Sequence, residues 1–409
     1  MLAQALDALG KPESIEPVRT KTRYTFLSAL AALPPQRGND AACWSAERAN
    51  HGERPVRHRL RAVSLLSLAG GLAVGATAGY WTGSMDRTAT PYGLPANHAE
   101  VQQSFQVGGA ATGATFGPGG VLAVGTARGS VALLNVRDGQ HKRVMLESGG
   151  AGPVTRTVFS PKGTVLAVGS DDGTVRLWLN ATQQPQLPAA TLKMREDGMY
   201  GGAVNDLAYS PDGKILAVAS STSMVRIWDV SHSDRPVPLA APERPHSVTR
   251  LAYSPDGNIL AVGSTDGTVQ LWDMTDPKDP QNIDGGRVDA DASVTALAFS
   301  ADRKSLAVGN SRGSVQLWDV SQSASPRYVD SSKPVGYTSD VTFNGPGYIL
   351  AASNSDGTVR LWEGLDDLMD PRLLTRKTNQ GELSSVTFAD SDNTLAVTGT
   401  DGSVQLWTA

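Results

Sequence analysis

Residues 248–273 read VTRLAYSPDGNILAVGSTDGTVQLWD and contain three short apolar segments separated by two tight turns. The first turn is Pro255-Asp256-Gly257-Asn258, and the second is Thr265-Asp266-Gly267. β-Branched and aromatic residues fill the segments, while Gly, Pro, Asp and Asn mark the turns, as in consecutive antiparallel strands. Asp-Gly pairs supply the positive φ that tight hairpins require. The stretch therefore predicts one unit of at least three strands.

This unit recurs along the chain with a period typical of repeat architectures. Its third segment ends in tryptophan six times, 44 to 50 residues apart, at Trp178, Trp228, Trp272, Trp318, Trp362 and Trp407. A seventh, degenerate copy, SVALL, ends at Leu134. Because the segments are apolar on both faces, each sheet must be covered by two neighbours, and a radial arrangement achieves this. The sequence predicts an all-β fold, a seven-bladed β-propeller.

The repeats resemble the WD-repeat family over residues 98–409. The dipeptide that names the family stands at Trp228-Asp229, Trp272-Asp273 and Trp318-Asp319. The family's Gly-His pair ahead of each blade is absent apart from a remnant at His246, so the histidine–aspartate hydrogen bond that the resemblance implies is not expected in most blades. The resemblance also implies that residues 98–108 supply the outer strand of the last blade. Period-two alternation then puts Val101, Phe105 and Val107 on one face of that strand.

One long apolar segment precedes the repeats. Residues 62–82 carry no charged side chain, and a helix of that length, about 31 Å, matches a bilayer core. This length predicts a transmembrane helix. Four arginines on its N-terminal side, Arg54, Arg57, Arg59 and Arg61, predict that residues 1–61 form a partly disordered cytoplasmic tail. Residues 83–97 are then a linker, and the propeller lies outside the plasma membrane as part of a single-pass protein. The alternatives are a signal peptide cleaved after Ala76-Thr77-Ala78, or a buried helix, which would make the propeller secreted or cytoplasmic.

Three glycines in this segment, Gly71, Gly75 and Gly79, fall four residues apart. They clear one face of the helix for a second backbone and so favour a homodimer through the membrane helix. The competing interpretation is that glycine is simply frequent in membrane helices.

Charge and motifs argue against nucleic-acid binding and catalysis. The net charge is -4, and the basic excess lies before residue 62, so the propeller is acidic and lacks the basic face of a nucleic-acid binder. The single cysteine, Cys43, cannot form an internal disulfide or a Cys-based zinc site. Gly309-Asn310-Ser311-Arg312-Gly313 matches the G-x-S-x-G hydrolase pattern, but it falls in a predicted turn rather than a strand-to-helix elbow.

The remaining chemical motifs are also weak. The sequence has no phosphate-binding loop motif, and its six histidines are scattered. Asp284–Asp291 lacks the residue order of a calcium loop and is expected to be a solvated loop between blades. No enzyme activity, cofactor or metal is predicted.

A candidate interaction surface emerges from one variable position in the innermost strands. This position holds Arg156, Asp206, Arg250 and Asp340 in four repeats, and Gly113, Ala296 and Ser385 in the others. Variable positions on a repetitive framework are typical of a binding face. The surface also includes charged residues of the second turns, Arg128, Asp172, Asp266, Arg312, Asp356 and Asp401. The alternative is that these are solvated charges, with the turn aspartates bonded to local amides.

The sequence is compatible with two functions. The first is a non-catalytic protein–protein interaction scaffold tethered to the membrane. The second is the sensor region of a signalling ATPase system whose catalytic part lies on another chain, because the order of basic stretch, apolar helix and repeats is similar to bacterial STAND regulators. A propeller enzyme would need a constellation of inward-facing acid, histidine or metal-binding residues around the channel, and the residues at the variable position lack that constellation.

Overall fold

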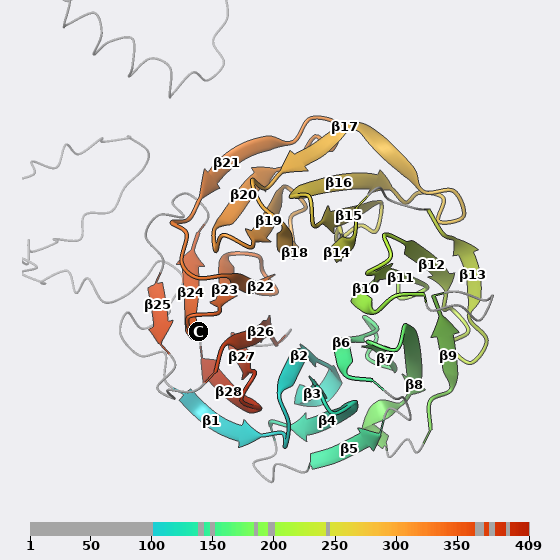
Figure 1. Cartoon of the computed structure of the whole chain (residues 1–409), viewed down its shortest axis with the longest axis vertical. Coiled ribbons are helices and arrows are strands. Elements are labelled where there is room, and N and C mark those ends of the chain that lie inside the picture. Colours follow the sequence, from blue (N-terminus) through green and yellow to red (C-terminus); the bar gives the residue numbers. More distant parts are fainter. Residues whose placement is uncertain are drawn as a thin grey trace, which may run out of the picture. The chain divides into compact units, whose positions relative to one another are not determined.

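The computed structural model describes residues 101–137, 143–147, 152–183, 187–194, 201–242, 246–364, 372–375, 381–389 and 393–408. These residues form seven four-stranded antiparallel sheets, which stand side by side around a central axis (Figure 1). The inner strand of each sheet contacts the inner strands of both neighbours, and the contacts close into a ring. The predicted seven-bladed propeller is therefore confirmed.

The tail, the linker and the apolar segment 62–82, with Gly71, Gly75 and Gly79, lie outside the described residues. Among the residues that the structure does describe, none belongs to a helix that is both long and apolar enough to span a bilayer.

Each sheet has an inner, a second, a third and an outer strand. The inner strands are β2 (Ala111–Phe116), β6 (Val154–Phe159), β10 (Val204–Tyr209), β14 (Val248–Tyr253), β18 (Val294–Phe299), β22 (Thr338–Phe343) and β26 (Leu383–Phe388). The second strands are β3 (Val121–Thr126), β7 (Val165–Ser170), β11 (Ile215–Ser220), β15 (Ile259–Ser264), β19 (Ser305–Asn310), β23 (Ile349–Asn354) and β27 (Thr394–Gly399).

The third strands carry the repeat tryptophans, and the outer strands complete the sheets. The third strands are β4 (Ser130–Asn135), β8 (Thr174–Leu179), β12 (Val225–Asp229), β16 (Thr268–Asp273), β20 (Val315–Asp319), β24 (Thr358–Glu363) and β28 (Ser403–Thr408). The outer strands are β1 (Val101–Gln106), β5 (Arg143–Glu147), β9 (Ala190–Lys193), β13 (Val237–Ala240), β17 (Gln281–Asp289), β21 (Arg327–Ser331) and β25 (Arg372–Thr375). Two short 3-10 helices, Pro118–Gly120 and Ala181–Gln183, lie in connections.

The first strand of the described chain completes the last sheet. β1 pairs antiparallel with β28, from Val101 opposite Trp407 to Gln106 opposite Ser403 (Figure 1). Its burial alternates along the strand, and Phe105 and Val107 pack against the sheet of β2 to β5. Val101 was expected on the same face, but it packs with Trp407 in the cluster shared with the sheet of β22 to β25, because the register shifts between Val101 and Gln103. The pairing of β1 with β28 is the one expected of residues 98–108, and it places the two ends of the ring in one sheet.

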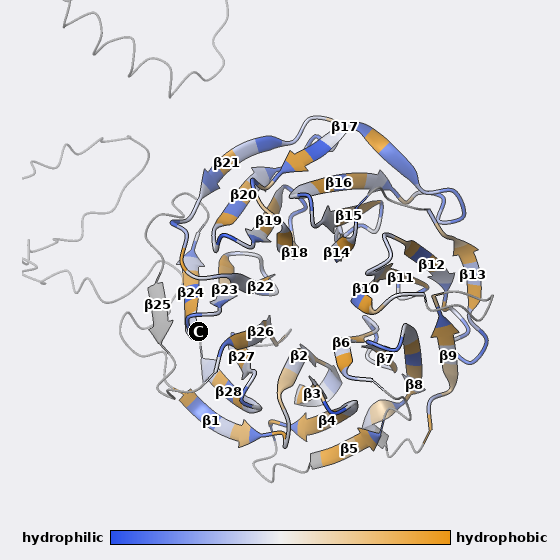
Figure 2. Cartoon of the chain, in the orientation of Figure 1, coloured by the Kyte–Doolittle hydropathy of each residue, from blue (hydrophilic) through white to orange (hydrophobic). Residues whose placement is uncertain are grey.

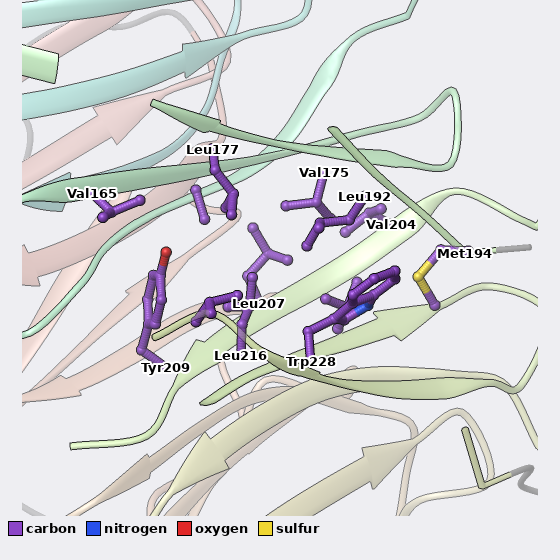
Figure 3. Close-up of a cluster of buried hydrophobic side chains, with 13 residues drawn as sticks. Val165, Val175, Leu177, Leu192, Met194, Val204, Leu207, Tyr209, Leu216 and Trp228 are labelled. Atoms are coloured by element: carbon purple, nitrogen blue, oxygen red, sulfur yellow. The ribbon is translucent and has the colours of Figure 1, made fainter. Parts of the chain in front are cut away.

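The hydrophobic core is divided among the interfaces between neighbouring sheets. One cluster joins β7, β8 and β9 to β10, β11 and β12, with Leu177, Leu216 and Trp228 buried between them (Figure 3). The strands inside the ring accordingly carry many apolar residues, while the outer strands β17 and β21 are largely hydrophilic (Figure 2). Five of the six repeat tryptophans are buried, and Trp318 is partly buried against Tyr328.

One expectation about the outer edge is wrong. The stretch Asp284–Asp291 was expected to be a loop, yet residues up to Asp289 belong to β17, which pairs with β16 from Asp273 to Thr268. Val288 is fully buried, so alternate residues of this acidic stretch face the core and hold it in the sheet.

Candidate functional site

The variable position of the inner strands is structurally equivalent in all seven sheets. Gly113, Arg156, Asp206, Arg250, Ala296, Asp340 and Ser385 each pair with the fifth residue of the adjacent second strand. In every sheet the register shifts immediately before this position, so the preceding residue is an extra one. A β-bulge re-aims the side chain that follows it. The repeated bulge thus turns one residue per sheet toward the central channel.

Six of these seven positions line one cavity in the channel, together with neighbouring residues such as Leu251 and Leu297. The cavity volume is about 160 Å³, below the range of about 300–1,000 Å³ typical of sites for drug-sized molecules. Four of its lining residues are the predicted site residues Arg156, Asp206, Arg250 and Asp340. The structure therefore brings together side chains that are far apart in the sequence, from Arg156 to Asp340.

Arg156 and Asp206 form an ion pair across two sheets. The Nε of Arg156 lies 3.2 Å from Oδ1 of Asp206, and both side chains are largely buried. The other oxygen, Oδ2 of Asp206, accepts a hydrogen bond of 2.8 Å from the backbone N–H of Leu251. Burial lowers the pKa of Arg156, but the charges of Asp206 and Asp340 outweigh that effect and leave its pKa above the ordinary value.

Asp340 and Arg250 occupy the same cavity without pairing with each other. Oδ2 of Asp340 accepts a hydrogen bond of 2.8 Å from Oγ of Ser385, and Oδ1 accepts one of 3.0 Å from the N–H of Val341. Burial raises the pKa of Asp340 against the opposing charge of Arg156. Burial and the like charge of Arg156 lower the pKa of Arg250 to about 10, so both arginines remain cationic at neutral pH.

The turn residues of the predicted surface lie on one face of the ring. We call face A the end that carries the turns between second and third strands, at residues 127–129, 171–173, 221–224, 265–267, 311–314, 355–357 and 400–402. Arg128 and Arg312 are exposed there, and neither lines the channel cavity. The variable position that faces the channel is the third residue of each inner strand. The first residue of each inner strand lies beside a turn of face A. The cavity is therefore nearer to face A than to the opposite end of the ring.

The turn aspartates are bonded locally, as the alternative interpretation expects. Oδ1 of Asp172 accepts hydrogen bonds from the N–H and Oγ1 of Thr174 at 3.0 and 2.6 Å. Equivalent pairs join Asp266 to Thr268, Asp356 to Thr358 and Asp401 to Ser403. Only the glycine of each Asp-Gly pair has a positive φ, which closes the turn after the aspartate.

The histidine remnant lies beside the turn aspartate, at a distance longer than that of an ordinary hydrogen bond. Nε2 of His246 lies 3.5 Å from Oδ2 of Asp266 on face A. Ser311 of the G-x-S-x-G match lies in the turn after β19, and no helix follows it, since residues 315–319 form β20. The hydrolase geometry is therefore not formed. Within the described part of the chain, no group of His, Cys, Asp and Glu side chains is arranged to hold a metal ion.

The sequence did not reveal two exposed residues of face A, Tyr337 and Val335. Tyr337, directly before β22, is 40% exposed and lies within electrostatic range of Arg156 and Arg250. Val335 is 37% exposed, and its N–H donates to the carbonyl of Gly313 at 3.1 Å, beside Arg312. An aromatic residue one step before an inner strand was the available signal, but it has no counterpart in the other repeats.

Comparison with known families agrees with this architecture. A model of the WD domain, G-beta repeat, matches residues 142–178, 196–229 and 372–408. The family described as nucleolar protein 10-like, N-terminal domain, matches residues 234–368. A search of curated proteins found none that matches the chain. With the seven sheets described above, the repeat matches support a WD-repeat β-propeller, a fold consistent with a protein-interaction scaffold.

Proposed function

We propose that the propeller is a non-catalytic platform that binds other proteins through face A. The observation that carries this proposal is the contrast between the repeated framework of the ring and the varied charges in its channel. The framework of strands and turns repeats seven times, whereas the equivalent channel position carries Arg156, Asp206, Arg250 and Asp340 in one cavity. In a repeat protein, a patterned set of charges on a uniform framework is what a specific partner would read.

The composition of face A supports the same function. Tyr337, Val335 and Arg312 lie within one connected part of this face, because the loop before β22 is hydrogen-bonded to the turns at Gly313 and Ser355. Exposed tyrosine and arginine are the residue types enriched at the energetic centres of protein interfaces.

Site-specific crosslinking in the full-length chain tests this proposal. A photoreactive amino acid is placed at Arg312 or Tyr337 on face A, and at Tyr348, which is 56% exposed in a turn at the opposite end. We expect a discrete crosslinked protein from the face A positions and none from position 348. Crosslinks that form equally at position 348, or only there, would contradict the assignment of face A.

The sequence further supports membrane tethering by residues 62–82, with the propeller outside the membrane and Gly71, Gly75 and Gly79 at a helix dimer contact. Protease treatment of intact cells checks the orientation. The propeller should be degraded while residues 1–61 are protected, and full protection of the propeller would overturn this topology.

The rival function, a sensor region for a separate signalling ATPase, rests on the order of segments similar to STAND regulators. It differs in the partner rather than in the site. Identification of the crosslinked partner as an ATPase would favour the sensor, and a partner without nucleotide-binding motifs would favour the scaffold.

A further inference from the structure

The channel cavity has more hydrogen-bond donors than acceptors. Both carboxylates are already bonded by the protein itself. Asp206 accepts from Arg156 and from the N–H of Leu251, while Asp340 accepts from Ser385 and from two backbone N–H groups. Neither aspartate therefore needs a further partner in the cavity.

Arg250, in contrast to the two aspartates, has a donor group that is not hydrogen-bonded within the described chain. Its Nη1 donates to the backbone carbonyl of Thr249 at 2.7 Å, while its buried Nε has no hydrogen-bond acceptor among the described residues. A buried donor without an acceptor is costly, and two like charges in one cavity add to the cost. An anion beside both arginines would supply an acceptor for the Nε of Arg250 and offset the like charge of Arg156.

We propose that the channel cavity is a binding site for a carboxylate group, held by Arg250 and Arg156. A guanidinium presents pairs of N–H groups that match the two oxygens of a carboxylate. The volume of about 160 Å³ suits a group of a few heavy atoms. The carboxylate comes either from a small free acid or from an Asp or Glu side chain of a protein partner. Only the second source rests on the proposed function.

Gly113 provides a way to fill the site from within. A Cβ at this position would lie 3.5 Å from Nη1 of Arg156, an ordinary contact distance, and Gly113 does not have a positive φ. An aspartate at position 113 therefore brings an internal carboxylate to Arg156. The matched substitution Gly113→Asn has the same shape without the charge.

Thermal denaturation of the full-length protein tests the site. Sodium acetate replaces sodium chloride at constant ionic strength, and the Tm is recorded for the wild type, Arg250→Gln, Gly113→Asp, Gly113→Asn and Arg235→Gln. Arg235 is an arginine with an 83% exposed side chain remote from the cavity lining. At acetate concentrations about tenfold above Kd, we expect a saturable rise of about 1–3 °C in the wild type.

The variants decide the interpretation. Arg250→Gln and Gly113→Asp should lose the acetate response, whereas Gly113→Asn and Arg235→Gln should keep it. An equal rise in Arg250→Gln and the wild type would overturn the proposal, as would the absence of any rise in the wild type. Because Gly113→Asp retains both arginines, its loss of response would remain informative if Arg250→Gln folded poorly.

A second arm separates the two sources of the carboxylate. Calorimetric titrations compare succinate with a short blocked peptide that contains one Asp, and with the same peptide containing Asn. Binding of succinate indicates a free acid, binding of the Asp peptide alone indicates a partner side chain, and binding of neither overturns the site. If crosslinking on face A fails while the acetate response is intact, the proposed interaction platform is wrong and the carboxylate site is still supported.

Discussion

At the scale of single residues, the turn aspartates explain how a charged surface can be structural. Asp172 accepts hydrogen bonds from Thr174 and an ion-paired hydrogen bond of 3.0 Å from Nη2 of Arg176. Burial alone would raise the pKa of Asp172, but the bonds from Thr174 and Arg176 outweigh it, and the pKa is lowered. The sequence identified this aspartate as a turn residue, and its partners follow from the fixed two- and four-residue spacings.

The lowered pKa predicts acid sensitivity with a definite sign. A carboxylate whose pKa is lower in the folded than in the unfolded state stabilises the fold above about pH 4, and this stabilisation is lost as the pH falls through the folded-state value. We expect Asp172→Asn to unfold more easily by about 1 kcal/mol at pH 7, with a smaller difference from the wild type below pH 3. Urea denaturation from pH 2 to 7 measures this, with the exposed Asp234→Asn as the control. A difference that did not shrink in acid would contradict the assignment.

The channel residues show what single-residue reasoning could not reach. The position of Arg156, Asp206, Arg250 and Asp340 was predictable, because it recurs at a fixed place in each repeat. Their pairing was not, since it depends on distances between sheets and on a bulge that a period-two pattern does not reveal. Tyr337 was missed for the same reason, because only the ring brings it near Arg156 and Arg250.

At the scale of elements, predictability follows the packing. The second and third strands have buried glycine, valine, leucine and tryptophan at nearly invariant positions, because each is covered by two neighbouring sheets. The outer strands have one exposed side, and their lengths vary from four residues in β13 to nine in β17. Such strands carry no fixed motif, which is why Asp284–Asp289 was mistaken for a loop.

The strand β1 provides a test at this scale. Deletion of residues 98–108 removes Val101, Phe105 and Val107 from the core and leaves β28 as an unpaired sheet edge. We expect the unfolding free energy to fall by about 4 kcal/mol or more and light scattering to reveal aggregation. A deletion of residues 83–93 is the matched control. Unchanged denaturation after loss of residues 98–108 would mean that β1 does not close the ring.

At the scale of the whole molecule, the ring is closed by a sheet built from both ends of the described chain. Val101 lies opposite Trp407, so a short linker from Thr408 to Val101 can join β28 and β1 as a hairpin. Opening that circle between Gly108 and Gly109 gives a permutant in which every sheet consists of four consecutive strands. Its ring is held only by side-chain packing between the first and last sheets.

Opening the same circle between Pro277 and Lys278, in the loop between β16 and β17, gives a matched permutant. There β17 becomes the first strand and pairs with β16 near the new C-terminus, so a strand from one end still completes the sheet of the other. A cross-link that closes a long loop typically contributes about 2–4 kcal/mol, and we take this range for the hydrogen-bonded closure of the ring by a shared sheet. We expect the permutant opened at 108 to lose stability in this range and the one opened at 277 to denature like the wild type, with the same far-UV circular dichroism spectrum in all three. Equal denaturation midpoints for the two permutants would show that packing between sheets, rather than the shared sheet, determines closure.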